Sequence, residues 1–134
     1  MTQRNSSRLF DLMAQGNVFE PGCPSREFLK HLTSSWGVLV LIALGGGTLR
    51  FSDLRRRVNG VSERMLAQTL QQLEGDGLVD RRSYPVVPPH VEYTLTALGH
   101  EAAQRVEALA EWVEENLPTL IANRDRARAL SGER

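Results

Sequence analysis

The chain has 134 residues, 41% of them hydrophobic, and its 16 basic and 16 acidic residues give a formal net charge of +0. This length suits one domain with a single core, and no apolar run reaches the ~18 residues that a membrane-spanning helix needs. The polar N-terminus lacks a signal peptide's apolar segment and the single cysteine cannot form an internal disulfide, so we expect a cytoplasmic protein with no membrane partner.

The charges are unevenly distributed. Residues 50–82 contain seven arginines and five acidic residues, whereas residues 96–134 contain seven acidic residues and five arginines. A neutral chain argues mildly against a nucleic-acid partner, because such proteins are usually basic, but the basic centre is compatible with one. Every basic residue except Lys30 is arginine, which suits bidentate contacts to phosphates and bases, although a genome rich in arginine codons gives the same count.

Residues 7–20 form an N-terminal arm. Residues 7–14 include four apolar side chains, enough for one short helix that Gly16 and Asn17 would end. Those apolar side chains need a partner such as a second subunit; the alternative is a loosely ordered arm.

The motif CPSR at residues 23–26 opens a helix predicted over residues 25–32. Proline is favoured in a first helical turn, which places Cys23 at or just before the N-cap. Unpaired N–H groups and the helix dipole favour the thiolate there, so Cys23 is a candidate redox sensor. The alternative is a small apolar residue packed against Phe28 or Phe19.

A helix-turn-helix is predicted after a buried helix. Residues 33–44 are apolar on nearly all sides, which is typical of a core helix. Residues 49–51 are long enough only for one edge strand, which we expect to pair with a later hairpin. Ser52 is predicted to cap a helix over residues 53–58, and an Asn59-Gly60 turn leads to a second helix that Ser62 caps.

The second helix is amphipathic. Met65, Leu66, Leu70 and Leu73 recur at helical spacing and mark its buried face. Glycines at 75 and 77 end it.

The pattern then changes from helical to alternating, which predicts two strands with a tip at prolines 85, 88 and 89. A polar-faced helix followed by a basic hairpin predicts a winged helix, with the helix in a major groove and the hairpin against the backbone or the minor groove.

These elements supply candidate DNA contacts. Arginine favours guanine, glutamine favours adenine, and alanine allows close approach and touches a thymine methyl. The candidate base-reading residues are Arg64, Ala67, Gln68 and Gln71. The candidate backbone contacts are Ser52, Arg55, Arg56 and Ser62, although an arginine triplet is more often a solvated face. The candidate wing residues are Arg81, Arg82 and His90.

The C-terminal part carries a long apolar stripe in steps of three or four. Its members are Leu98, Ala102, Val106, Leu109, Trp112, Val113 and Leu117. The stripe is broken by Pro118 and has more apolar surface than a small sheet can cover, so residues 96–121 are predicted to be a dimerisation helix; the alternative is packing within one chain. Residues 122–134 alternate in charge and are predicted to be a frayed tail.

The fold class expected is mainly α with a small antiparallel sheet. A single domain over residues 1–134 would have a winged helix-turn-helix core at 23–95, flanked by N- and C-terminal dimerisation helices. His31, His90 and His100 are scattered and no nucleophile–base pair or metal-ligand spacing appears, so we expect no enzyme, no metal and no cofactor.

The sequence resembles HxlR-type winged helix-turn-helix transcriptional regulators, relatives of the MarR group. The segments that carry the resemblance are CP at 23–24, Trp36 within the buried helix, LRFSDL at 49–54, VSERML at 61–66, LQQLEGDGLV at 70–79 and YPVVPPHVEYTLT at 84–96. The family implies a homodimer that binds an inverted-repeat operator in double-stranded DNA and regulates nearby genes. Several members use the cysteine before the proline to sense oxidants or electrophiles. His90 stands where the family usually carries arginine.

The sequence therefore predicts a dimeric, sequence-specific DNA-binding regulator that acts as a repressor and is switched by oxidation of Cys23 or by a small molecule. The alternative is a winged helix used only for protein contacts, because a fold does not determine a function. The neutral net charge is the best support for that alternative.

Overall fold

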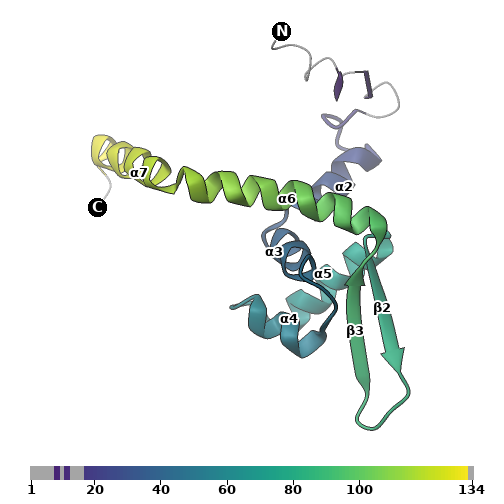
Figure 1. Ribbon diagram of the computed structural model, residues 1–134. Coiled ribbons are helices and arrows are strands. Elements are labelled where there is room, and N and C mark those ends of the chain that lie inside the picture. Colours follow the sequence, from purple (N-terminus) through teal and green to yellow (C-terminus); the bar gives the residue numbers. More distant parts are fainter. Residues whose placement is uncertain (1–7, 10, 13–16, 133–134) are drawn as a thin grey trace.

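The computed structural model describes residues 8–9, 11–12 and 17–132. The elements in chain order are α2 (Pro24–Thr33), α3 (Ser35–Leu44), β1 (Leu49–Arg50), α4 (Phe51–Arg57), α5 (Glu63–Gly75), β2 (Val79–Tyr84), β3 (His90–Leu95), α6 (Ala97–Glu115) and α7 (Leu117–Ser131) (Figure 1). Of the helix expected over residues 7–14, the described residues 8–9 and 11–12 are helical, and residues 7, 10, 13 and 14 lie outside the described part. The expected class, helical with a small antiparallel sheet, is confirmed.

The core is built around α3, which packs against α5 and α6. Val40, Leu41 and Leu44 of α3 are almost completely buried, as an all-apolar helix requires. Leucines of α4 and α5 and the inner face of the hairpin complete the core, which includes Leu54, Leu66, Leu70, Leu73, Val79, Tyr93 and Leu95.

The sheet has three antiparallel strands in the order β1-β3-β2. The edge strand expected after α3 therefore pairs with the hairpin, through Leu49 opposite Tyr93 and Arg50 opposite Glu92. The hairpin ends where Tyr84 faces His90, and the three prolines lie in the loop between them. It projects from the body on the side away from α6 (Figure 1).

The two helix starts of the helix-turn-helix differ from each other. Ser62 caps α5 as predicted, because its Oγ accepts a hydrogen bond from the N–H of Met65 at 3.1 Å. The prediction that Ser52 caps the preceding helix is wrong, because α4 begins at Phe51 with Arg50 as its N-cap. The carboxylate of Asp53 reaches back to the N–H of Arg50 at 3.4 Å and satisfies it, so the helix starts two residues earlier than a cap at Ser52 would allow.

The C-terminal region is helical almost to its end. Thr96 caps α6 by accepting the N–H of Gly99 at 3.0 Å. The frayed tail predicted over residues 122–134 is wrong, because α7 continues to Ser131. Pro118 lies in the first turn of α7, where a missing N–H costs no hydrogen bond, so it begins a helix after the break at Asn116. Figure 1 shows α7 leading away from the body at the far end of α6.

Within the described residues no single helix is long and apolar enough to cross a bilayer; α2 and α3 reach that length and composition only as a pair bent by 69°.

Candidate nucleic-acid interface

The helix α5 presents a polar ridge to solvent. Arg64, Gln68 and Gln71 are exposed and Ala67 is half-buried, so the structure brings the four predicted base-reading residues onto one side of α5. The buried side consists of Leu66, Leu70 and Leu73 together with Thr69.

Met65 does not belong to the buried side of α5. The prediction that it does is wrong, because its side chain is 39% exposed. The buried arc is centred on residues 66, 69, 70 and 73, and Met65 lies at the edge of that arc, under α2.

Two grooves flank the polar ridge of α5. One, of about 650 Å³, lies between α2 and α5 and includes Met65 and Gln68 in its wall. The other, of about 400 Å³, lies between α5 and the hairpin and includes Ala67, Gln71 and Arg81. Because a groove lies on each side of the ridge, the side chains of the ridge project beyond the neighbouring surface.

The helix α4 brings Ser52, Arg55 and Arg56 together around a shallow hollow of about 610 Å³. Both arginines already have acidic partners. Arg55 Nη1 donates to Glu63 Oε2 at 2.9 Å, and Arg56 pairs with Asp53. The Oγ of Ser62 is engaged in capping α5. Arg55 and Arg56 must therefore exchange an internal partner for a phosphate, whereas the hydroxyl of Ser62 can donate to a phosphate while it still caps α5.

The three predicted wing residues do not form one cluster. Side chains alternate between the two faces of a strand, so Arg81 lies on the inner face beside α5, whereas Arg82 lies on the outer face. His90 shares the outer face with Arg82, because it stands two residues before Glu92, which pairs with Arg82.

A hydrogen-bonded cluster that sequence reasoning missed occupies the outer face. His90 Nε2 and Glu92 Oε2 are 2.7 Å apart, and the Tyr84 hydroxyl donates to Glu92 Oε1 at 3.1 Å. His90 Nδ1 lies 2.7 Å from Nη2 of Arg50 on β1. The hydrogen bond from His90, with that from Tyr84 and the charge of Arg50, holds the pKa of Glu92 below its usual value. The two-residue spacing of His90 and Glu92 could have indicated their pairing, but Arg50 enters only through strand register.

Cys23 is the N-cap of α2, which confirms its predicted position. Its carbonyl accepts the N–H groups of Arg26 and Glu27 at 3.1 and 3.4 Å. The side chain is half-buried, and a hydrogen bond from the Ser25 hydroxyl, with backbone N–H groups, lowers the pKa of the thiol.

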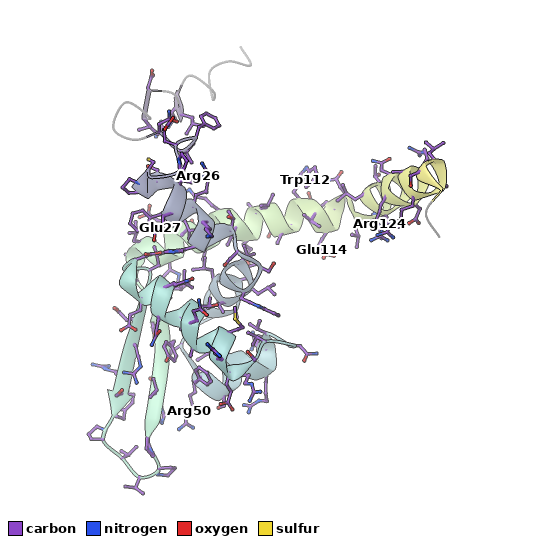
Figure 2. The ribbon with its side chains drawn as sticks, turned by 180° about the vertical axis from the view of Figure 1, so that it is seen from behind. Arg26, Glu27, Arg50, Trp112, Glu114 and Arg124 are labelled. Carbon is purple, nitrogen blue, oxygen red and sulfur yellow. The ribbon has the colours of Figure 1, made fainter. Side chains whose placement is uncertain are left out.

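The apolar stripe of α6 is divided between core and solvent. Val106 is buried and Ala102 and Val113 are half-buried, because this side of α6 packs on the body. The other members, Leu98, Leu109 and Trp112 of α6 and Leu117 at the start of α7, are exposed. Leu109 and Trp112 are 57% and 52% exposed in the single chain, and Figure 2 shows Trp112 and Glu114 projecting from opposite sides of α6.

In the part of the chain that the structure describes, no group of three or more His, Cys, Asp or Glu residues could hold a metal ion.

Comparison with known proteins identifies the family. Residues 31–120 match the HxlR-like helix-turn-helix family. The HTH-type transcriptional regulator YtfH of Escherichia coli (strain K12) is 61% identical over 117 residues, which cover 87% of this chain and 93% of the relative. The solved structure of the transcriptional regulator ytfH from Salmonella typhimurium has a TM-score of 0.79 at 64% identity and covers 82% of this chain and 98% of its own. The redox regulator HypR in its reduced form has a TM-score of 0.68 at 34% identity, covering 74% and 98%.

Family match, relatives and winged-helix architecture agree with the resemblance seen in the sequence: the chain belongs to the HxlR-like helix-turn-helix family and is a transcriptional regulator of that type.

Proposed function

We propose that the protein is a dimeric repressor that binds an inverted-repeat operator in double-stranded DNA, with α5 in the major groove. The observation that supports this most directly is the exposed ridge of Arg64, Gln68 and Gln71 between two grooves. A polar ridge that projects from a small domain has the shape that a major groove admits, and its side chains are those that pair with guanine and adenine edges.

The contacts divide into readers and anchors. Arg64, Gln68 and Gln71 read base edges, and Ala67 lets α5 approach a thymine methyl. The side chains of α4 and Ser62 hold the phosphate backbone, and Arg81 and Arg82 hold the wing against it. His90 belongs to the wing as well, but both of its ring nitrogens are engaged by Arg50 and Glu92. Phosphate contacts set the position of the protein on DNA, while base contacts set the sequence.

The dimer is formed through α6. Its exposed apolar residues Leu98, Leu109 and Trp112, together with Leu117 at the start of α7, make a surface that a second copy would cover. Two-fold symmetry would place the two copies of α5 about 34 Å apart, which is one turn of DNA.

Cys23 is the proposed switch. Its position at the start of α2, its partial exposure and its lowered pKa favour a reactive thiolate. The structural neighbour HypR is a redox regulator, which supports an oxidant as effector. A small-molecule effector is the alternative signal. Treatment with diamide should release DNA from the wild-type protein and not from Cys23→Ser; equal release from both excludes Cys23 as the sensor.

A DNA-binding assay on an operator selected from random DNA tests the main proposal. Arg64→Ala should relax specificity at one base position, since a bidentate pair contributes about 1–3 kcal/mol of discrimination. Arg82→Ala should weaken binding to all DNA sequences alike. It should also reduce the slope of log K against log salt concentration by about 0.9. If neither change alters binding, the assignment of α5 and the wing is wrong.

The second candidate function is a winged helix that contacts only proteins, supported by the net charge of +0. A steep loss of DNA affinity with salt would count against it, because phosphate contacts release counterions.

A further inference from the structure

Two arginines flank a single carboxylate across the outer face of the sheet. Arg50 on β1 and Arg82 on β2 both stand opposite Glu92 of β3. The carboxylate is already occupied, because Oε1 accepts from the Tyr84 hydroxyl and Oε2 from the His90 ring. Each carboxylate oxygen of Glu92 thus has a donor from β2 or β3, and among the described residues neither guanidinium is held by a hydrogen bond to Glu92.

The two ring nitrogens of His90 have opposite hydrogen-bonding roles. An arginine side chain only donates, so Nδ1 of His90 accepts from Nη2 of Arg50 at 2.7 Å. The ring proton then resides on Nε2, which donates to Glu92. This chain of bonds uses one donor nitrogen of Arg50 and leaves the remaining guanidinium N–H groups free to bind.

The arginines of α4 provide a contrast. Arg55 and Arg56 each pair directly with a carboxylate, whereas among the described residues no carboxylate oxygen lies within 4.0 Å of the nitrogens of Arg50 or Arg82. The charge of Arg50 acts on Glu92 from a greater distance. Arg82 contacts the ring of Tyr84, 5.9 Å from its centroid. Arg50 lies between the hairpin and α4 (Figure 2), beside the elements to which the proposed function assigns the DNA backbone.

We propose that Arg50 contacts a DNA phosphate and that His90 is the positioning residue that holds its guanidinium for that contact. This inference rests on the proposed function. It gives the edge strand β1 a phosphate contact of its own, in addition to the contacts of the hairpin. Held by His90 at one end, the guanidinium loses less conformational freedom when it meets a phosphate, so the contact gains affinity.

Operator affinity and its salt dependence, measured by fluorescence anisotropy, test the proposal with a matched control. Arg50→Gln should weaken binding by about tenfold and lower the salt slope of log K by about 0.9, the value for one phosphate contact. Arg50→Lys keeps the charge and should restore the slope. Arg124→Gln makes the same charge change on α7, far from the wing (Figure 2), and should change neither quantity.

A double-mutant cycle isolates the part that His90 plays. His90→Ala should weaken binding when Arg50 is present and should have no further effect in the Arg50→Gln background. His90→Gln should bind like the wild type, because an amide can accept from Arg50 with its oxygen and donate to Glu92 with its nitrogen. Circular dichroism establishes that each variant is folded.

The outcomes separate this inference from the function on which it rests. If the wild type binds the operator and Arg50→Gln matches Arg124→Gln, the role of Arg50 is refuted and the proposed function stands. If His90→Ala has the same effect in both backgrounds, or His90→Gln behaves like His90→Ala, His90 does not position Arg50. If the wild type shows no salt-dependent DNA binding at all, both proposals fail.

Discussion

The Nδ1 atom of His31 on α2 lies 2.7 Å from Oδ2 of Asp76, the residue that follows α5 as its C-cap. The two side chains are only 17% and 11% exposed, and 45 residues separate them in the chain. The helix that begins at Cys23 is thereby attached to the end of the helix that carries the candidate base-reading residues.

This attachment should contribute to stability. Asp76→Ala leaves the His31 ring without its partner in a largely buried position, and we expect it to lower the free energy of unfolding by about 1–3 kcal/mol. Glu74→Ala, on the exposed surface of the same turn, is the control and should change the free energy by less than about 0.5 kcal/mol. Urea denaturation monitored by circular dichroism measures both. Equal midpoints for the two variants would contradict a structural role for the pair.

A close backbone approach occurs at Gly99 in the first turn of α6. A Cβ built there would lie 1.9 Å from the carbonyl oxygen of Leu78, which also accepts the N–H of Thr96 at 3.0 Å. Gly99→Ala therefore forces α6 away from the sheet and should destabilise the protein by about 1–3 kcal/mol or more. Gly75→Ala in α5 meets no atom within 4 Å and should leave stability unchanged or raise it by up to about 1 kcal/mol. Thermal unfolding measures both variants. Equal melting temperatures for Gly99→Ala and Gly75→Ala would show that the contact between Gly99 and Leu78 is not tight.

The proposed dimer depends on the uncovered side of α6. Leu109→Glu combined with Trp112→Glu would place two carboxylates in an apolar interface, where unpaired charge is strongly disfavoured, and the protein should become a monomer. Val87→Glu makes the same kind of change at the exposed tip of the hairpin and should leave the oligomeric state as it is. Sedimentation velocity distinguishes the two results. A doubly substituted protein that still sediments as a dimer would place the interface elsewhere.

The reactivity of Cys23 should depend on Ser25. Because the hydrogen bond from the Ser25 hydroxyl is the main cause of the lowered thiol pKa, Ser25→Ala should raise that pKa and reduce the thiolate fraction at neutral pH. Alkylation by iodoacetamide should then be slower at pH 7 and equally fast at a pH where both thiols are ionised. Cys23 is the only cysteine, so the modification is measured without interference. Identical pH–rate profiles for the two proteins would exclude Ser25 as the cause.

Glu92 should make the wing sensitive to acid. Its pKa is lowered in the folded protein, so it contributes stability above the ordinary glutamate pKa of about 4.3, and that contribution disappears as pH falls through the lower folded value. The melting temperature of Glu92→Gln should lie below that of the wild type at pH 7, and the difference should shrink toward pH 3. A difference that does not vary with pH would mean that the charge of Glu92 does not stabilise the fold.

Features that depend on neighbouring residues were predictable. Ser62 caps α5 because a short polar side chain reaches the N–H group three residues ahead, whatever the rest of the fold does. The polar ridge of α5 follows from helical periodicity, and the turn between β2 and β3 follows from prolines that cannot join a ladder.

The wrong predictions concern residues whose local pattern is compatible with more than one structure. Ser52 carries a capping side chain, but Asp53 satisfies the N–H of Arg50 and moves the helix start. Pro118 can end a helix or begin one, and the chain breaks at Asn116 so that the proline lies in the first turn of α7. Met65 matched a helical pattern, but the width of the buried arc depends on which helices pack against it.

The amino-acid sequence by itself determined the winged helix-turn-helix family, the order of its elements and the polar side of α5, because propensity, capping and periodicity act within a few residues. Only the tertiary structure decided which polar and charged side chains meet: Arg50 with His90, Arg55 with Glu63 and His31 with Asp76. Such pairings depend on strand register and helix packing between distant segments, and no local pattern encodes them. For that reason only the folded chain shows that Arg50 and Arg82, on the outer face of the sheet, form no direct ion pair with any described residue.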